Sequence, residues 1–295
     1  MYCSPNVNIK KHYTCFDYNE LQQIALAFNI YIQKNKICPQ LNKNSNKLTD
    51  KRICKIKRLI NINKPQRELW YSIYNRLKYI CPYEYCWVDL DFINNIEDKY
   101  LKEKLKYFTF KPKITQGMNA WLTTQDINNV MQQYQDFYSS FKFLGALPSD
   151  FYKLISVDFS KIFDHNQIGI IFNLDNHTQK GSHWVSFLID NENKTIEYYD
   201  SAGKYPNKNI QQFIDKIHNY ISKRGLVYKI HYNTARHQLE NNECGVYAIY
   251  FIICRLSGRS FNNIVKNGPK DKDMNHFRQY IFLPQLNHGR NLKNN

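Results

Sequence analysis

The stretch HWVSFLIDNENKTIEYYD, residues 183–200, decides how this chain folds. It holds two runs rich in β-branched and aromatic residues on either side of the polar segment DNENK, which is the pattern of a β-hairpin. A tight turn in this segment places Val185 opposite Asp200. His183 is then the diagonal neighbour of Asp200 on the same face, about 7–8 Å away, so that the imidazole and the carboxylate can reach each other.

The apolar residues of the hairpin select this register. One face carries Val185, Phe187, Ile189, Ile196 and Tyr198, whereas the other carries Ser186, Glu197 and Tyr199. Because a shift of one residue would expose the whole apolar set, the register is strongly specified. We expect the apolar face to be the core side, and the helix that starts at Cys244 to pack on it.

Further strands and helices surround the hairpin. Strand composition marks residues 169–172 and 227–232, and helical periodicity marks residues 124–138, 209–221 and 244–256. The last of these segments is apolar nearly all round, which is typical of a buried central helix. The sequence therefore predicts an α+β fold in which a central mixed, mostly antiparallel sheet packs on the helix that carries Cys244.

The length of 295 residues allows one large domain or two smaller ones. The densely charged segment 94–115 marks a change in composition, so we predict a mainly helical extension in residues 1–110 and a second domain in residues 111–295. No apolar run reaches the roughly 18 residues of a membrane span, and the N-terminus lacks the apolar stretch of a secretory signal. We therefore expect a soluble intracellular protein without a membrane partner, whose eight cysteines are mostly reduced thiols and not a disulfide framework.

The extension is predicted to contain helices over residues 17–33, 49–60 and 68–80. Asp17 can cap the first helix together with Glu20, three residues later. The first two helices and the polar loop between them resemble the small SAP-type nucleic-acid-binding fold, in a pattern that many helical hairpins share.

Positive charge is concentrated in the first 66 residues. The whole chain has a net charge of +16, and residues 1–66 contain 12 lysines and arginines against three acidic residues, a net charge of +9. Such a segment could bind an acidic partner, with nucleic acid as the obvious one. The preferred alternative is a solvated, lysine-rich surface in a chain whose composition is biased toward Lys, Asn and Ile.

Cys81 and Cys86 flank the segment PYEY. A gap of four residues is not the two-residue spacing of a zinc knuckle, and no set at typical spacing is completed by Cys38, Cys54 or His12. Small buried thiols are the preferred interpretation. Neither a metal nor another cofactor is expected.

Cys244 stands where a helix begins, after the polar turn ENNE. The partial positive charge of a helix start and a nearby imidazolium both favour a thiolate, and a thiolate–imidazolium pair is a competent nucleophile near neutral pH. We expect Asp200 to accept a hydrogen bond from Nδ1–H of His183 and to hold the ring in one tautomer. Gly245 permits close approach of a substrate to the backbone behind the sulfur.

Gln238 precedes Cys244 by six residues. Its side-chain amide can donate to a developing oxyanion together with the backbone N–H of Cys244, a contribution of about 3 kcal/mol to lowering the barrier. Taken singly, these residues also have structural interpretations as a core histidine, a small core cysteine and a turn after Asp200. In this order, and with the hairpin geometry in agreement, they predict a cysteine nucleophile with its base, carboxylate and oxyanion donor.

A family resemblance rests on the motifs around these residues. The chain resembles the ubiquitin-like-protein-specific protease family, to which the adenovirus protease is related, at His183-Trp184, Tyr199-Asp200-Ser201, Gln238 and Glu243-Cys244-Gly245-Val246-Tyr247. Trp121-Leu122 resembles the opening of that family's protease domain, and the match covers residues 115–285. Within the family, the chain is similar to the polyprotein-processing proteases of large nucleocytoplasmic DNA viruses, such as that of African swine fever virus, which carry a helical N-terminal extension. Asp200 departs from the asparagine of the swine fever enzyme and agrees with the cellular enzymes.

The resemblance implies a papain-like or adenain-like cysteine protease core and an endopeptidase that cleaves after Gly-Gly or Gly-Ala-like sequences. It implies that His183, Asp200 and Cys244 carry the catalysis, with Gln238 in the oxyanion hole.

A narrow substrate channel that only small residues can thread is also implied. Trp184 would help to form it, with Trp121 and Gly245 as further substrate-binding residues. A tryptophan at the edge of the core is the other interpretation of Trp184.

Three functions are compatible with these features. In the viral branch of the family the substrates are capsid or core precursor proteins, and the enzyme is packaged in the particle, which implies a location in the virion and the host cytoplasm. A deconjugating isopeptidase acting on a ubiquitin-like modifier would use the same chemistry with a different docking surface. A non-catalytic binding module based on residues 1–110 is the third, and the complete set of catalytic residue types argues against it.

Overall fold

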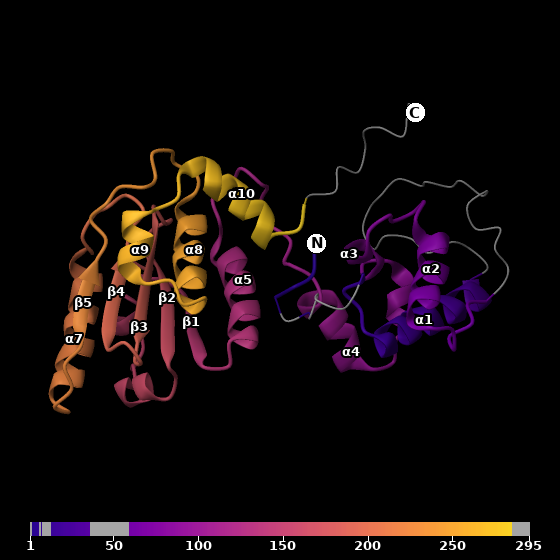
Figure 1. Cartoon of the computed structure of the whole chain (residues 1–295), viewed down its shortest axis with the longest axis horizontal. Helices are drawn as coiled ribbons and strands as arrows, with labels where there is room; N and C mark the ends of the chain where they lie inside the picture. Colours follow the sequence, from indigo (N-terminus) through magenta and orange to yellow (C-terminus); the bar gives the residue numbers. More distant parts are fainter. Residues whose placement is uncertain (1, 6, 8–12, 36–58, 285–295) are drawn as a thin grey trace. The chain divides into compact units, whose positions relative to one another are not determined.

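The computed structural model describes residues 2–5, 7, 13–35 and 59–284 (Figure 1). The chain divides into two compact units, Met1–Lys111 and Pro112–Asn295. The boundary expected from the sequence lay between residues 110 and 111.

The second unit contains a five-stranded mixed sheet in which the strands follow chain order, β1 to β5 (Figure 1). The outer pairs, β1 with β2 and β4 with β5, are parallel, and the inner pairs are antiparallel. The strands are β1 Phe141–Pro148, β2 Gln167–Asn173, β3 Trp184–Asp190, β4 Thr195–Tyr199 and β5 Lys229–Tyr232. The predicted α+β class is confirmed, as are the predicted strands β2 to β5.

Strand β1 was not predicted. Its pairing with β2 shifts register between Phe143 and Ala146, and Gly145 inside this bulge has a φ of +130°. A bulged edge strand lacks the two-residue alternation that identifies a strand in a sequence.

Helices cover both faces of the sheet (Figure 1). They are α5 Thr124–Phe137, α6 Phe151–Leu154, η4 Phe159–Phe163, α7 Lys208–Ser222, α8 Cys244–Leu256, α9 Phe261–Lys266 and α10 Asp271–Ile281. The predicted helices correspond to α5, α7 and α8, whereas α9 and α10 were not foreseen.

The hairpin register is the predicted one, since Ser186 pairs with Tyr199 and Phe187 with Tyr198. The predicted packing of the Cys244 helix is wrong. The face with Val185 and Phe187 is buried against α7, and α8 packs on the opposite face.

Polar residues of the second face explain this arrangement, because α8 provides hydrogen-bond partners for Ser186, Glu197 and Asp190. Ser186 donates its hydroxyl to the carbonyl oxygen of Ala248 at 2.8 Å. Arg255 of α8 donates to the buried carboxylates of Glu197, at 2.7 and 2.9 Å, and Asp190, at 2.9 Å. Polar side chains that are satisfied by a covering helix belong to a buried face although they look solvent-facing in the sequence.

The first unit is helical in its described part, with α1 Tyr18–Asn35, α2 Gln66–Leu77, α3 Glu84–Trp87, η2 Asp91–Asn95, α4 Lys99–Glu103 and η3 Lys104–Phe108. The predicted cap of α1 is present, because Asp17 and Glu20 accept hydrogen bonds from each other's backbone N–H groups at 2.8 Å. Nearly all of the predicted helix over 49–60 lies outside the described residues. So do ten of the 12 lysines and arginines of residues 1–66, and the nucleic-acid hypothesis stays a prediction.

Four cysteines of the first unit form disulfides, Cys3–Cys15 and Cys81–Cys86, with Cα separations of 5.4 and 5.9 Å. The prediction of reduced thiols is wrong for these four. The argument from cellular compartment concerns only the redox environment, whereas pairing also requires that the fold hold two Cβ atoms side by side, which composition does not show. The free cysteines of the described chain are Cys244 and Cys254.

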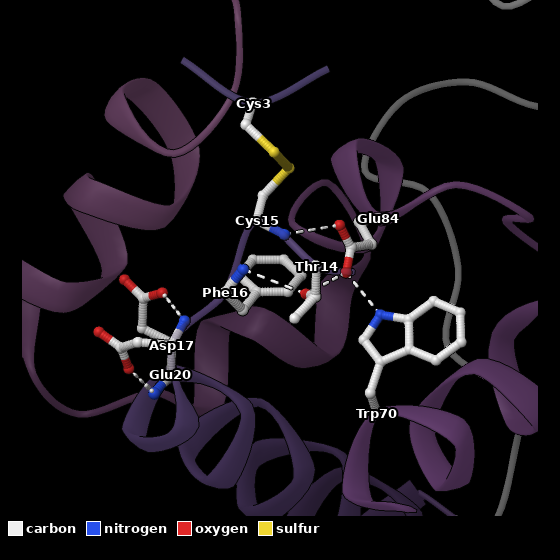
Figure 2. The surroundings of a disulfide bond; sticks show 8 residues. All are labelled: Cys3, Thr14, Cys15, Phe16, Asp17, Glu20, Trp70 and Glu84. Atoms are coloured by element: carbon white, nitrogen blue, oxygen red, sulfur yellow. Dashed lines mark hydrogen bonds between the residues drawn. A yellow bond between two sulfur atoms is a disulfide. The ribbon is translucent and has the colours of Figure 1, made fainter. Parts of the chain in front are cut away.

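Figure 2 shows how the segment around Cys15 is held. The carboxylate of Glu84 accepts hydrogen bonds from the hydroxyl of Thr14, the backbone N–H of Cys15 and the indole N–H of Trp70. This half-buried carboxylate of α3 therefore joins Thr14 and Cys15, at the Cys3–Cys15 disulfide, to Trp70 of α2.

In the part of the chain that the structure describes, no helix is both long enough and apolar enough to cross a membrane. No three histidine, cysteine or acidic side chains there group together in a way that could hold a metal ion.

Candidate active site

Three elements bring His183, Asp200 and Cys244 together. His183 lies directly before β3, Asp200 directly after β4, and Cys244 is the first residue of α8. Nε2 of His183 lies 2.6 Å from Oδ1 of Asp200, and the side chain of Cys244 lies near enough to the imidazole to raise its pKa. The imidazole therefore lies between a thiol and a carboxylate, which is the order that a cysteine nucleophile requires.

One detail of this arrangement differs from the prediction. The ring nitrogen that faces Asp200 is Nε2 and not Nδ1. The diagonal position on the hairpin decides that His183 and Asp200 meet, but the rotation of the ring depends on where α8 places the sulfur.

Asp200 is fully buried and is oriented by the turn that follows it. Its Oδ1 also accepts the N–H of Ala202 at 2.8 Å, and its carbonyl oxygen accepts the N–H of Gly203 at 2.8 Å and the side-chain amide of Asn233 at 2.7 Å. Gly203 has a φ of +70°, and an added Cβ would lie 2.8 Å from the backbone of Ala235. The turn therefore needs glycine at this position.

The pKa of His183 is shifted by competing effects. Burial lowers it, but the hydrogen bonds and charge interactions with Asp200 and Cys244 outweigh burial and raise the pKa of His183 from 6.5 to about 9. The imidazolium form therefore persists at neutral pH beside the Cys244 sulfur. An imidazolium stabilises a neighbouring thiolate.

Gln238 is held by hydrogen bonds at both ends of its side-chain amide. Oε1 accepts the hydroxyl of Ser201 at 2.6 Å, and Nε2 donates to the carbonyl oxygen of Glu240 at 2.6 Å. The backbone N–H of Gln238 also donates to the carbonyl oxygen of Ser201 at 3.0 Å. Because an amide nitrogen has two hydrogens, one N–H of Gln238 remains for a further acceptor.

Ser201 was not proposed as a site residue from the sequence. It is 1% exposed and follows Asp200 directly, so that one turn orients both the carboxylate and the amide of Gln238. Its position next to Asp200 was the available signal, but a serine in a turn is too common to be singled out on that ground.

The two tryptophans proposed for the substrate channel line one cleft of about 490 Å³. Trp184 is buried and donates its indole N–H to the carbonyl oxygen of Leu122 at 2.9 Å, and Trp121 is 43% exposed and donates to Oδ1 of Asn242 at 3.2 Å. The ring of Trp184 belongs to the core and also borders the cleft, so its position at the edge of the core is confirmed, whereas its role in a substrate channel stays a prediction.

The remaining wall of this cleft was not predicted. Leu122 and residues 146–148 of β1 form its apolar part, and its polar part lies around the start of α5, at the end of β2 and in the segment that follows β2, including Thr123, Thr124, Asn173, Asp175, Asn176, His177, Gln179 and Lys180. A polar wall beside two aromatic rings suits an extended peptide backbone, whose N–H and C=O groups need partners.

Packing against Leu122 explains why position 245 is a glycine, which the sequence did not show. A Cβ added at Gly245 would lie 3.0 Å from Cβ of Leu122, so that the glycine lets α8 start in close contact with the segment after Trp121. This position supports the cleft wall indirectly, through Leu122.

Comparison with known proteins agrees with this geometry. The Ulp1 protease family, C-terminal catalytic domain, matches residues 95–292. A candidate thiol protease of Acanthamoeba polyphaga mimivirus is 33% identical over 294 residues, covering 96% of this chain and 93% of that protein. A cysteine protease of African swine fever virus is 26% identical over 195 residues, covering 59% of this chain and 71% of that protein, and in some isolates it is named SUMO-1 cysteine protease.

A similar fold is seen in a crystal structure of the African swine fever virus protease. It superposes with a TM-score of 0.61 at 20% identity, covering 97% of this chain and 96% of that one. The predicted protease fold and the predicted resemblance to viral proteases are both confirmed. With a matching family domain over two thirds of its length and a mimivirus relative along nearly all of it, the chain belongs to the Ulp1 protease family and is a cysteine protease.

Proposed function

We propose that this protein is an endopeptidase in which Cys244 is the nucleophile, His183 the general base and acid, Asp200 the orienting carboxylate and Gln238 an oxyanion donor. The observation that carries the proposal is the position of His183, which is hydrogen-bonded to Asp200 and close enough to Cys244, the first residue of a buried helix, to interact with it electrostatically. The contacts of Gln238 with Ser201 and Glu240 support the fourth role by holding its amide in one orientation.

The reaction follows from these positions. The Cys244 thiolate attacks the carbonyl carbon of the substrate, a C–S bond forms, and the oxyanion accepts hydrogen bonds from the Cys244 backbone N–H and the Gln238 amide. The C–N bond then breaks, and the leaving amine takes the proton of the His183 imidazolium. Neutral His183 next removes a proton from water, which attacks the thioester and releases the carboxylic acid and Cys244.

The substrate class proposed is a protein with Gly-Gly or Gly-Ala-like residues before the scissile bond, in a viral structural precursor. The two large rings of Trp121 and Trp184 line the cleft, which supports small residues next to the scissile bond. The relatives in mimivirus and African swine fever virus support a viral role, with action in the virion and the host cytoplasm. The runner-up is deconjugation of a ubiquitin-like modifier, which is supported by the name SUMO-1 cysteine protease of the swine fever relatives.

One experiment separates the two substrate classes. The protein is incubated with a Gly-Gly-Xaa peptide and, separately, with a ubiquitin-like modifier that carries a C-terminal vinyl sulfone. Cleavage of the peptide without labelling by the modifier supports the endopeptidase, whereas rapid labelling of Cys244 supports the deconjugase. Failure of both would remove the proposed specificity.

Peptide hydrolysis is expected to decline as the pH rises through about 9, because His183 then loses the proton that the leaving amine needs. The raised pKa of His183 also stabilises the folded state. This contribution to the free energy of unfolding is fully present below pH 6.5 and is lost as the pH rises through about 9. The measurement is kcat/KM against pH for a peptide and for an activated ester, whose leaving group needs no proton. A decline centred near pH 6.5 for the peptide would contradict the contacts of His183.

Replacing Ser201 by alanine is expected to lower kcat by about tenfold with little change in KM, the equivalent of one hydrogen bond of about 1.4 kcal/mol. The amide of Gln238 loses the donor that holds its oxygen and can turn its N–H away from the oxyanion. Ser186→Ala is the matched control, because Ser186 is equally buried but donates to the Ala248 carbonyl within the core. Equal kcat values for Ser201→Ala and Ser186→Ala would show that Ser201 does not act through Gln238.

A further inference from the structure

One face of α10 carries two buried charged residues that the reaction described above does not use. Arg278 is 1% exposed and Asp271 is 8% exposed. They are seven residues apart, which places them on the same side of the helix two turns from each other. A charged side chain is rarely buried unless its partners are fully arranged around it, so the contacts of both residues are informative.

The guanidinium of Arg278 joins three points next to the active site. Nε donates to the carboxylate of Glu243 at 3.0 Å, Nη2 to the carbonyl oxygen of Asn242 at 2.9 Å, and Nη1 to the carbonyl oxygen of Ala120 at 2.8 Å. Glu243 and Asn242 directly precede Cys244, and Ala120 directly precedes Trp121. One side chain therefore holds both the two residues before Cys244 and the residue before Trp121, whose ring lines the cleft.

Asp271 holds the other end of the same loop. Its Oδ2 accepts the backbone N–H groups of Leu239 at 2.9 Å and Glu240 at 3.0 Å, and its Oδ1 accepts the hydroxyl of Tyr247 at 3.0 Å. Leu239 and Glu240 directly follow Gln238. The loop between Gln238 and Cys244 is thus fastened to α10 at both ends, by a carboxylate that accepts from its amides and a guanidinium that donates to its carbonyls.

The charge of Arg278 has a second consequence. Burial raises the pKa of Glu243, and the hydrogen bond and charge of Arg278 act against this effect. An unpaired carboxylate one residue before Cys244 would repel a thiolate. The ion pair removes this repulsion while it holds the loop.

We propose, on the basis of the proposed function, that Arg278 and Asp271 are positioning residues of the protease. They set the spacing between the Gln238 amide and the Cys244 backbone N–H, the two oxyanion donors, and they hold Trp121 at the cleft through Ala120 and Asn242. Oxyanion stabilisation depends on donors that are already in place, and misplacement by about 1 Å can cost a hundredfold in rate.

The test compares two reactions of Cys244 in the full-length protein. Alkylation by iodoacetamide, followed on the Cys244 peptide by mass spectrometry, needs the thiolate and His183 but no oxyanion hole. Hydrolysis of a Gly-Gly-Xaa peptide needs the oxyanion donors and the cleft as well. Arg278→Lys keeps a positive charge beside Glu243 but cannot reach three acceptors at once.

For Arg278→Lys, kcat for hydrolysis is expected to fall by about tenfold to a hundredfold, while the alkylation rate stays within about threefold of the unaltered protein. The matched control is Arg255→Lys, at the far end of α8, where the buried guanidinium pairs with Asp190 and Glu197. Arg255→Lys is expected to lower Tm but to leave the ratio of the hydrolysis rate to the alkylation rate unchanged. If Arg278→Lys does not fold, Asp271→Ala gives the same comparison, because it frees the other end of the loop.

Four outcomes are decisive. A selective loss of hydrolysis in Arg278→Lys or Asp271→Ala supports the proposal. Parallel loss of hydrolysis and alkylation, or hydrolysis unchanged in both variants, overturns it. If the Cys244→Ala variant still hydrolyses the peptide as fast as the unaltered protein, the proposed function itself is overturned. Failure of the positioning proposal and failure of the proposed function are therefore distinguishable.

Discussion

Cys244→Ala is expected to lower kcat for hydrolysis of a Gly-Gly-Xaa peptide by about six orders of magnitude, the size of effect seen when a triad nucleophile is removed. Without the sulfur no thioester can form, and His183 and Gln238 have no tetrahedral intermediate to act on. The measurement is product formation by mass spectrometry over long incubations, because the residual rate falls near that of the uncatalysed reaction.

The control for this prediction is the second free thiol of the described chain. Cys254 lies on the same helix and is buried, and its sulfur accepts a hydrogen bond from Nη1 of Arg259 at 3.3 Å. Cys254→Ala is expected to leave kcat unchanged. Equal cleavage by Cys244→Ala and the unaltered protein would remove Cys244 as the nucleophile.

Asp200→Ala is expected to lower kcat by about four orders of magnitude, as for the orienting carboxylate of other triads. His183 would lose the acceptor at 2.6 Å from Nε2 that selects its ring orientation. Asp200→Asn is expected to cost only about tenfold, because an amide oxygen can accept from Nε2–H as in cysteine proteases that use asparagine. Steady-state kinetics on both variants measure the difference.

The pH profile of Asp200→Asn adds a readout that loss of folding cannot imitate. The carboxylate charge is one of the causes that raise the pKa of His183, so the decline in peptide hydrolysis should move below pH 9 in this variant. An unchanged profile, or equal losses in the alanine and asparagine variants, would mean that Asp200 does not act on His183 through this hydrogen bond.

Interactions between near neighbours could be read from the sequence. The alternation of residues 183–200 was sufficient for the hairpin register and for the meeting of His183 with Asp200, because strand pairing across a tight turn leaves few alternatives. The apolar run after Cys244 identified a buried helix, since few other environments accept such a run. Residue types at these positions then indicated the chemistry.

Interactions between distant residues could not be read in this way. The sequence pattern of the hairpin identified an apolar face, but α8 packs on the other one, where Ser186, Glu197 and Asp190 find partners about 60 residues away. The rotation of the His183 ring depends on the same packing. The cysteine pairs of the first unit likewise depend on which segments the fold brings together.

The sequence by itself therefore determined the α+β class and the hairpin, and it predicted His183, Asp200, Cys244 and Gln238 as the catalytic residues. Only the tertiary structure decided how these groups are aimed, through Ser201 behind Gln238 and through Asp271 and Arg278 behind the loop that leads to Cys244. The physical reason is distance along the chain. A hydrogen bond such as that from Arg278 to Ala120 joins residues 158 positions apart, and no local pattern records which of many buried acceptors a distant guanidinium will meet.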